Sequence, residues 1–553
     1  MPTLNWIGKK AVVNHHRQVP FHLLKDVSGL SVGDPGTGNL IVEGDNLLAL
    51  KALLPYYAGQ VKCIYIDPPY NTGNEKWIYN DSVNSSEIRD WLGKVVGDES
   101  EDLTRHDKWL CMMYPRLSLL RQFLRDDGVI FISIDENEVQ NLKCLMIDIF
   151  GPENFIAELP TIMNLKGNQD EFGFAGTHEY TLVWARHKNE NLKLGEFEID
   201  DEEIDEWGED EIGFFKKGAN LKSTGVNAPR QKRPNLFFPI YISLKNEISL
   251  ERQSKSDIEI LPITDKKEMS WRWSRDKISR EPHNLIVVRN ENNVSIYKKQ
   301  RPAIGNIPSK KPKSFFYKPE YSSGNGTAQL KSIFGRKVFD NPKPIDLIMD
   351  FLRIGSNKDA SILDSFAGSG TTGHAVMQLN KEDGGNRRFI LVEMDSKICK
   401  EITAERVKRV SEGYKNSKGE KVEGLGGGFR YCQLGESLFD EKGNIRNTVR
   451  FAELAKHVYF TETGEPLPKQ SKANSPLLGI YNGLAVYLLY NGILKDKTPD
   501  GGNVLTTKVL SLLPKHNGPK VIYGTACKIG SVRLRKLNIV FKQLPYKLKV
   551  DAL

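Results

Sequence analysis

Short apolar runs alternate with amphipathic stretches along the first 190 residues. The predicted strands are residues 39–45, 61–66, 128–135 and 181–185, and the predicted helices are residues 46–57, 107–125 and 137–150. Pro115 is expected to kink or interrupt the second of these helices. Residues 71–106 are polar and irregular, which predicts a loop. The alternation of strands and helices predicts a parallel, doubly wound α/β sheet.

A second strand–turn–helix pattern begins at residue 361. The apolar run 361–363 leads into a glycine-rich turn in which Gly368, Gly370 and Gly373 fit G-x-G-x-x-G. The next predicted strand ends at Glu393, where an acidic group can bind ribose hydroxyls. This order predicts a site for a nucleoside cofactor, but the glycines alone leave NAD, FAD and S-adenosylmethionine (SAM) open.

The turn Asp67-Pro68-Pro69-Tyr70 follows the apolar run 61–66 directly. The carboxylate therefore stands at the carboxyl end of a predicted strand, where open α/β sheets bind ligands. Prolines lack an N–H, so the turn presents carbonyl oxygens rather than donors. A carboxylate, these acceptors and an aromatic ring suit a planar ring with an exocyclic amino group. The alternative is an ordinary turn with a chance Asp-Pro.

Two details favour SAM as the cofactor. Asp364 stands just before the glycine turn, where its carboxylate could meet the cationic amino acid end of SAM. The same carboxylate would repel the diphosphate of a dinucleotide. The Asp67 turn also offers an acceptor for an amino group, which a hydride-transfer enzyme does not need.

The bulk properties indicate a globular protein of several folded units. The chain has 553 residues and a net charge of +8, the sign that binding to phosphates requires. Its six cysteines form no C-x-x-C pair, which favours a reduced, cytoplasmic protein without disulfides or a metal site. No stretch of about 18 apolar residues predicts a membrane span, and the N-terminus has no apolar signal-peptide core.

The chain resembles a known family at these motifs. The Asp67 turn together with Phe366-Ala367-Gly368-Ser369-Gly370 resembles the signature pair of SAM-dependent amino-methyltransferases that act on DNA, in the order of their β class. Three longer strings resemble the modification (Mod) subunits of type III restriction-modification systems: Asp67–Gly73, Trp271–Ser274 and Ser323–Leu330. The resemblance covers roughly residues 35–435 and is weak beyond them.

The resemblance implies a circularly permuted Rossmann-like SAM-dependent methyltransferase fold, built on a doubly wound sheet. The implied domains are an N-terminal part of the methyltransferase core (1–188), a target-recognition domain (189–335), a C-terminal part of the core (336–435) and a small α/β accessory domain (436–553). The accessory domain is expected to serve subunit contacts or to stabilise the cofactor half.

The resemblance also assigns roles to residues. The implied catalytic residues are Asp67, Pro68, Pro69 and Tyr70, and the implied cofactor-binding residues are Asp45, Asp364, Phe366, Ala367, Gly368, Ser369, Gly370, Thr371 and Glu393. An N-cap is the alternative role for Asp45. His178-Glu179-Tyr180 resembles a motif near the base pocket, and the alternative is a capping pair before a strand.

The middle of the chain interleaves basic and aromatic residues after an acidic run at 198–206. The basic clusters are Arg230–Arg233, Trp271–Arg275, Lys298–Arg301 and Lys310–Lys313. Lys and Arg can contact DNA phosphates, and Arg or Gln can read base edges. Solvated surface is the alternative for any single cluster, but four in one insert favour target recognition.

The expected activity is site-specific methyl transfer from SAM to adenine N6 in duplex DNA, with the base flipped out of the helix. By resemblance, Asp at position 67 favours adenine, whereas relatives that methylate cytosine N4 more often carry Ser there. The expected partners are double-stranded DNA, a separate restriction (helicase–nuclease) subunit and a second copy of the chain. The alternatives are a non-catalytic DNA-specificity subunit that targets a nuclease, a cytosine-N4 methyltransferase and an RNA methyltransferase.

Overall fold

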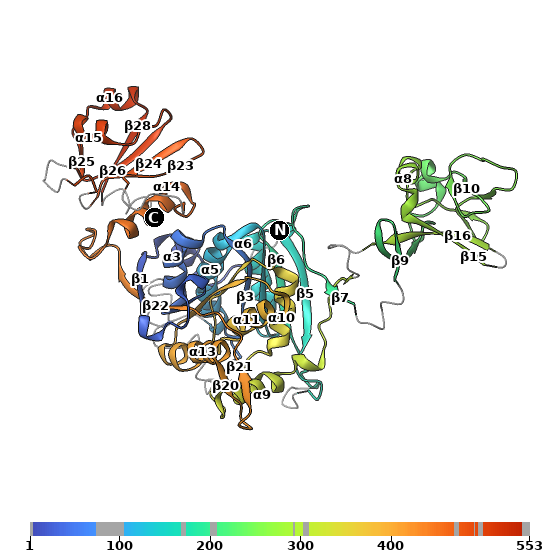
Figure 1. Ribbon diagram of the computed structural model, residues 1–553, viewed down its shortest axis with the longest axis horizontal. Coiled ribbons are helices and arrows are strands. Elements are labelled where there is room, and N and C mark those ends of the chain that lie inside the picture. The colour runs from blue at the N-terminus through green and yellow to red at the C-terminus, as the bar shows by residue number, and fades with distance from the viewer. Residues whose placement is uncertain are drawn as a thin grey trace. The chain divides into compact units, whose positions relative to one another are not determined.

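The computed structural model describes residues 4–72, 104–167, 173–199, 207–290, 293–301, 309–468, 475–490, 493–495 and 502–544 (Figure 1). It divides into two compact units. One unit is formed by Met1–Leu194 together with Lys313–Leu553, and the other by Gly195–Pro312. Most of the loop predicted at 71–106 lies outside the described residues.

The first unit contains a nine-stranded sheet, drawn at the centre of Figure 1. In spatial order its strands are β1 (His22–Asp26), β22 (Arg430–Ser437), β2 (Leu40–Glu43), β19 (Arg388–Glu393), β18 (Ser361–Asp364), β3 (Val61–Ile66), β4 (Leu124–Ile134), β6 (His178–Ala185) and β5 (Phe155–Ile162). The strands from β22 to β4 are parallel, whereas β1 and β6 run antiparallel to their neighbours. The prediction of a doubly wound α/β sheet is confirmed, but the predicted strand at 181–185 lies within β6 and runs antiparallel to β4, so the prediction of an all-parallel sheet was wrong.

The centre of this sheet joins two distant stretches of the chain. Strands β2, β3 and β4 come from the first 134 residues, whereas β18 and β19 come from residues 361–393. β18 pairs in parallel with β3, with Ile362 opposite Cys63 and Leu363 opposite Ile64. The sheet is therefore a circular permutation of a nucleoside-binding fold, as predicted.

Helices cover both faces of the sheet. Three of them share a hydrophobic core with one face: α3 (Asn46–Tyr57), α5 (Arg105–Phe123) and α6 (Val139–Phe150). On the other side pack α10 (Ile345–Gly355), α11 (Thr371–Asp383) and α13 (Glu405–Glu412). Phe351 of α10 stacks against Tyr65 and Phe131 of the sheet. Alternate residues of β3 thus face opposite helical layers, as a buried parallel strand requires.

Helix α5 corrects one prediction. It begins at a capping box made by Thr104 and Asp107 and continues without a break through Pro115 to Phe123. A proline in a helix interior removes one hydrogen bond and crowds the preceding turn. Here Met113 and Leu117 are both buried against the sheet, so tertiary packing holds the helix together across the proline. The predicted interruption was wrong.

The remaining elements of the first unit lie around this core. They are α1 (Lys9–Val12), α2 (His15–Gln18), α9 (Ser323–Phe334), α12 (Ser396–Ile398), a π-helical turn (Cys399–Ala404), β20 (Gly413–Lys415) and β21 (Lys421–Glu423). After residue 436 come α14 (Phe451–Thr463), β23 (Leu477–Tyr481), β24 (Leu484–Leu488), β25 (Val504–Leu505), α15 (Thr507–Leu512), β26 (Lys520–Gly524), β27 (Ala526–Cys527), α16 (Ser531–Lys536) and β28 (Ile539–Gln543). Strands β23, β24, β26 and β28 form a small mixed sheet with a hydrophobic core on each face.

The second unit is built from small antiparallel sheets. Its elements are β7 (Phe197–Glu198), β8 (Trp207–Asp210), β9 (Gly213–Asn220), β10 (Ile240–Ile242), β11 (Ile248–Ser249), β12 (Ile258–Ile260), β13 (Ile263–Thr264), β14 (Lys267–Glu268), α8 (Arg275–Arg280), β15 (Leu285–Asn290), β16 (Asn293–Gln300) and β17 (Ser309–Lys310). Its core gathers Trp271, Ile240 and Ile296. Residues 313–335, including α9, belong to the first unit.

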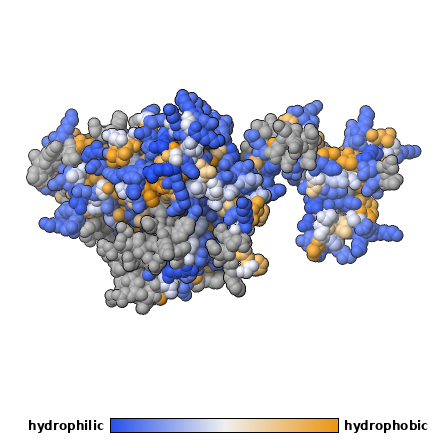
Figure 2. Space-filling model, turned by 90° about the horizontal axis from the view of Figure 1, so that it is seen from below, coloured by the Kyte–Doolittle hydropathy of each residue, from blue (hydrophilic) through white to orange (hydrophobic). Residues whose placement is uncertain are grey.

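The surface drawn in Figure 2 is mostly hydrophilic, with apolar residues in small scattered groups. Phe174, Val226 and Leu244 are among the large apolar side chains that are exposed. Within the described part of the chain, no helix is long and apolar enough to cross a membrane.

Candidate active site

The two predicted motifs leave the sheet side by side. Asp67 follows the last residue of β3, and the glycine turn follows Asp364, the last residue of β18. These strands are parallel neighbours, which places their carboxyl ends about 4.8 Å apart. Strand order also reverses at this point, with β19 on one side and β4 on the other. Open α/β sheets bind their ligands at such a switch point.

The turn after β3 is anchored from helix α5. Trp109 donates from its indole nitrogen to the Pro69 carbonyl at 2.7 Å. Arg105 donates to the Asn71 carbonyl at 2.9 Å, and the Asn71 side chain donates back to the Arg105 carbonyl. Asn71 takes a left-handed φ of 58°, which Asn tolerates better than most residues. The backbone around Asp67 is thereby held rigidly.

A buried charge network surrounds Asp67. The Lys343 ammonium lies 3.3 Å from the Asp67 carboxylate, and 2.7 and 2.9 Å from the two Glu179 oxygens. The Tyr70 hydroxyl donates to Glu179 at 2.9 Å and contacts the Lys343 ammonium, which also lies 4.8 Å from the Tyr70 ring centre. The network joins residues from β6, the Asp67 turn and the segment before α10.

Burial sets the protonation state of this network. Desolvation raises the pKa of Asp67 to about 6, although the Lys343 charge lowers it, and the Glu179 charge adds to the increase. The neighbouring carboxylates raise the pKa of Lys343 against the effect of burial. Burial and the carboxylates raise the pKa of Tyr70 well above its usual value. At neutral pH the site thus holds an ionised Asp67, a charged Lys343 and a protonated Tyr70.

Several buried polar atoms of the described residues have no hydrogen-bond partner, and two of them lie at the carboxyl ends of these strands. They are Oδ1 of Asp67, which lies 3.3 Å from the Lys343 ammonium, and the hydroxyl of Ser365; Nε of Arg406, near the glycine turn, is a further one. Buried polar atoms are nearly always hydrogen-bonded in folded proteins. A ligand with a hydrogen-bond donor for Asp67 and a polar group for Ser365 would satisfy both atoms.

The glycine turn brings helix α11 close to the sheet. Gly368 and Gly370 take left-handed φ values of 49° and 76°. A Cβ on Gly373 would lie 3.0 Å from Leu391 and 3.1 Å from Val407, so this glycine permits close packing of α11. These are two of the roles that glycines play in nucleoside-binding turns.

Asp364 is buried and bonded within the same turn. Its carboxylate accepts from the Phe366 N–H at 3.0 Å and from the Thr372 hydroxyl at 2.6 Å. Burial raises the pKa of Asp364 to about 7 despite these bonds. The first effect of this carboxylate is therefore to shape the turn. The predicted contact with the amino acid end of SAM stays a prediction.

The other predicted acidic residues also lie near the carboxyl ends of the parallel strands. Glu393 ends β19 and accepts from the Gly368 N–H at 2.8 Å and the Asp395 N–H at 2.9 Å. Asp45 caps α3 through the Leu48 N–H, and its other oxygen pairs with Arg116 at 3.2 Å. The N-cap role of Asp45 is thus present in the structure. The implied placement of Asp45 on the strand next to β19 was wrong, because β2 ends at Glu43 and Asp45 follows two residues later, at the start of α3.

The structure adds an arginine that the sequence did not suggest. Arg406 of α13 is fully buried and donates to Thr371 Oγ1 at 2.8 Å, to Ser369 Oγ at 3.1 Å and to its carbonyl at 3.4 Å. It also contacts Gln329 and His374. Its hydrogen-bond partners among the described residues include no carboxylate, and burial lowers the pKa of Arg406 to about 9.

Glu179 belongs to a motif that the sequence analysis noted, whereas Lys343 was not predicted as a site residue. Glu179 lies within β6, so its alternative role as a cap before a strand was wrong. Lys343 directly precedes Pro344, the N-cap of α10, and resembles any surface lysine at a helix start. The Lys-Pro pair was its only local signal.

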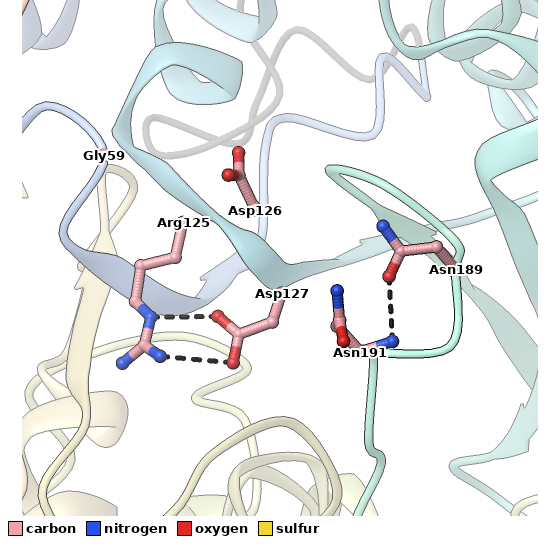
Figure 3. A pocket seen from close by; sticks show the side chains of 6 residues that line it. All are labelled: Gly59, Arg125, Asp126, Asp127, Asn189 and Asn191. Carbon is pink, nitrogen blue, oxygen red and sulfur yellow. Dashed lines mark hydrogen bonds and ion pairs between the residues drawn. The ribbon is translucent and has the colours of Figure 1, made fainter.

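A pocket of about 400 Å³ lies at the opposite end of the parallel strands, near their amino ends (Figure 3). It is lined by Gly59 before β3, by Arg125, Asp126 and Asp127 near the start of β4, and by Asn189 and Asn191. Figure 3 shows the Arg125 guanidinium paired with Asp127. This edge carries the amino ends of the parallel strands, where open α/β sheets do not bind ligands.

Several basic residues of the second unit have internal partners. Arg230 pairs with Glu268, while Lys299 and Arg301 share Asp210. Arg272 donates to backbone carbonyls, and Trp271 is buried in the core. Some residues of the clusters at 230–233, 271–275 and 298–301 therefore stabilise the second unit, in addition to any role of the exposed charges.

The described residues contain no group of three or more His, Cys, Asp or Glu side chains that could hold a metal ion. All six cysteines are free.

Comparisons with known proteins agree with this geometry. A family model described as DNA methylase matches residues 61–405, from β3 to α13. The chain is 37% identical to the EcoPI Mod subunit of a type III restriction-modification enzyme from Escherichia phage P1, over 99% of this chain and 90% of that protein. It is 33% identical to the type II methyltransferase M.KpnI of Klebsiella pneumoniae, over 72% and 93%. The StyLTI Mod subunit of Salmonella typhimurium is 32% identical, over 68% and 57%. The chain therefore belongs to the DNA methylase family.

Proposed function

We propose that this chain transfers a methyl group from SAM to the N6 amino group of a flipped-out adenine in duplex DNA. The observation that carries the proposal is Asp67 Oδ1, a buried acceptor with no hydrogen-bond partner among the described residues. It stands at the end of β3, next to the glycine turn of β18. A base amino group at Asp67 would therefore lie beside a cofactor bound at the glycine turn.

The residues present suit such a cofactor. SAM supplies an electrophilic methyl group on a sulfonium, so the protein mainly has to place the amino nitrogen in line with it. Glu393, at the end of β19, suits ribose hydroxyls, and the partnerless Ser365 hydroxyl suits a polar group of the cofactor. Ala367, buried in the turn, and the half-buried Phe366 offer apolar contact.

Asp67 would act on the nucleophile. An adenine amino nitrogen is weak because its lone pair is delocalised into the ring. Hydrogen bonds to the Asp67 carboxylate and the Pro68 carbonyl favour a pyramidal nitrogen and offset the positive charge that develops during attack. Tyr70 would stack on the base, and its hydroxyl is fixed by Glu179. The base must leave the duplex to reach this position.

The test is labelled-methyl transfer to DNA by the wild type and by Asp67→Ala, with the product base identified by mass spectrometry. We expect N6-methyladenine from the wild type and a rate lower by about 100- to 1,000-fold in the variant. SAM binding should change by less than about threefold, because Asp67 is outside the glycine turn. N4-methylcytosine as the product would overturn the choice of base, and normal transfer by Asp67→Ala would overturn the mechanism.

The partners form part of the same proposal. The similarity to Mod subunits over nearly the whole chain supports a role as the modification subunit of a type III system, with a separate restriction subunit and a second copy of the chain as partners. Residues 195–211 of the second unit carry 11 Asp and Glu and no Lys or Arg, whereas residues 212–312 carry 21 Lys and Arg against nine Asp and Glu. The basic excess of this later part supports a role for it in target recognition. We place the reaction in the cytoplasm, with host DNA.

A further inference from the structure

Lys343 connects the two turns of the candidate site. Its backbone carbonyl accepts from the Thr371 hydroxyl of the glycine turn at 3.3 Å. Its side chain reaches Asp67 and Glu179 on the other side. One residue thus touches the segment expected to hold the cofactor and the segment expected to hold the base.

The charge of Lys343 has a specific place in this site. The ammonium is largely buried, and burial of a cation is costly unless opposite charges compensate. Asp67 and Glu179 supply that compensation. In return, the lysine charge opposes the effect of the Glu179 charge, which raises the pKa of Asp67.

We propose that Lys343 is a positioning residue for methyl transfer, which holds the Asp67 carboxylate charged and in place while leaving Oδ1 free for the base. The inference rests on the proposed function. The ion pair at 3.3 Å lacks hydrogen-bond geometry, so Lys343 acts on Oδ1 through its charge. The hydrogen-bonding capacity of that oxygen is left for the amino group.

The groups around Asp67 support this role. Tyr65, Tyr70, Glu179 and Asp364 are its electrostatic neighbours, and none of them is a cation. Glu179 raises the pKa of Asp67, whereas Lys343 lowers it. Since the pKa of Asp67 is about 6 with the lysine present, loss of the lysine should move it towards or above neutral pH.

The experiment is the pH profile of single-turnover methyl transfer by the full chain, at saturating SAM, between pH 5.5 and 9.5. For the wild type we expect an acid limb with a midpoint near pH 6. In Lys343→Met the limb should move up by at least one pH unit, so that the rate is lower by at least about twofold at pH 7 and about fivefold at pH 6, and recovers towards pH 9. Lys343→Arg, which keeps the charge, should restore most of the wild-type profile.

The matched control is Lys318→Met. Lys318 also pairs with a buried carboxylate, Asp350 at 2.5 Å, but outside the site. Its pH profile should match that of the wild type. A rate for Lys343→Met that is lower by the same factor at every pH, with SAM affinity unchanged, would overturn the proposal, because it would indicate packing alone.

A second variant protects the test if Lys343→Met does not fold. Glu179→Gln removes the carboxylate that raises the pKa of Asp67. Of the two carboxylates that pair with Lys343, Asp67 then remains. Its acid limb should move to lower pH, and a limb that stays or rises would contradict the inference. Failure of the proposed function is distinguishable, because the wild type itself would then form no N6-methyladenine in DNA.

Discussion

The two turns at the carboxyl ends of β3 and β18 handle buried charge in different ways. After β3, opposite charges meet directly, with Lys343 against Asp67 and Glu179. After β18, Asp364 and Arg406 are both buried, but each is held by neutral groups. Asp364 accepts from a hydroxyl and a backbone N–H, and Arg406 donates to hydroxyls, carbonyl oxygens and an imidazole.

The difference shows in the pKa values. At the first turn, the lysine opposes desolvation and leaves the pKa of Asp67 at about 6. At the second turn, burial raises the pKa of Asp364 to about 7 and lowers that of Arg406 to about 9. The protein thus compensates its own charges where a neutral base would react. Charge of both signs is less compensated at the second turn, which we propose as the site for the zwitterionic end of SAM.

The largest loss of SAM affinity and of stability should follow from removing the Asp364 carboxylate, which holds the second turn together. Asp364→Ala leaves the Thr372 hydroxyl and the Phe366 N–H without their acceptor in a buried site, which costs about 1–3 kcal/mol for each lost partner. We expect SAM affinity to fall by about 100-fold and the free energy of unfolding to drop. Titration calorimetry and urea denaturation would measure the two effects.

Asp364→Asn is the matched control for this change, because it keeps one acceptor oxygen and should lose less of both quantities. The comparison of the two turns would fail if Asp364→Ala bound SAM as well as Asp67→Ala does.

The sequence predicted the local pieces of this fold well. β3 and α3 have the predicted bounds because each is set by a continuous apolar or amphipathic pattern. The pairing of β18 with β3 followed from the alternation of elements and from two motifs that belong at strand ends. Strands β1, β5 and β22 were not foreseen, since they lie at or near the edges of the sheet and are only partly buried.

The site residues could be predicted from the sequence only where they belong to a motif of consecutive residues. Both turns carry such signals, in prolines and glycines. Lys343 and Arg406 depend on the tertiary arrangement, since each reaches its partners from a different element and neither has a distinctive neighbourhood in sequence. The uninterrupted helix at Pro115 has the same explanation, because the packing of α5 outweighs a local preference.

Substitution of Arg406 should have a smaller effect on SAM binding, and it tests the part of the second turn that carries positive charge. The guanidinium donates to the Ser369 and Thr371 hydroxyls at the head of α11, where the helix dipole also favours an anion. We expect Arg406→Met to weaken SAM binding by about tenfold, or about 1.4 kcal/mol. Binding of decarboxylated SAM should be unchanged, because that ligand lacks the anion.

Arg409→Met, on the same helix, is the control for this prediction. Arg409 is partly exposed and pairs with Glu405, so it should leave both affinities as in the wild type. An equal loss for the two ligands in Arg406→Met would mean that the arginine supports only the shape of the turn.

The smallest effect concerns His374, which also contacts Arg406. Burial and the guanidinium lower the pKa of His374 well below its usual value. The folded protein therefore keeps this imidazole neutral, while the unfolded chain binds a proton below about pH 6.5. Stability should fall as the pH drops through that value, by up to about 1.4 kcal/mol per pH unit from this group.

His374→Gln should remove that part of the acid dependence, although the buried His457, with a pKa lowered to about 3, retains its own share. Urea midpoints at pH 7.5, 6.5 and 5.5 would give the two slopes. If both proteins lost stability equally over this range, the imidazole would be able to take up a proton beside Arg406. The second turn would then tolerate a further positive charge, and the contrast with the compensated network around Asp67 would be lost.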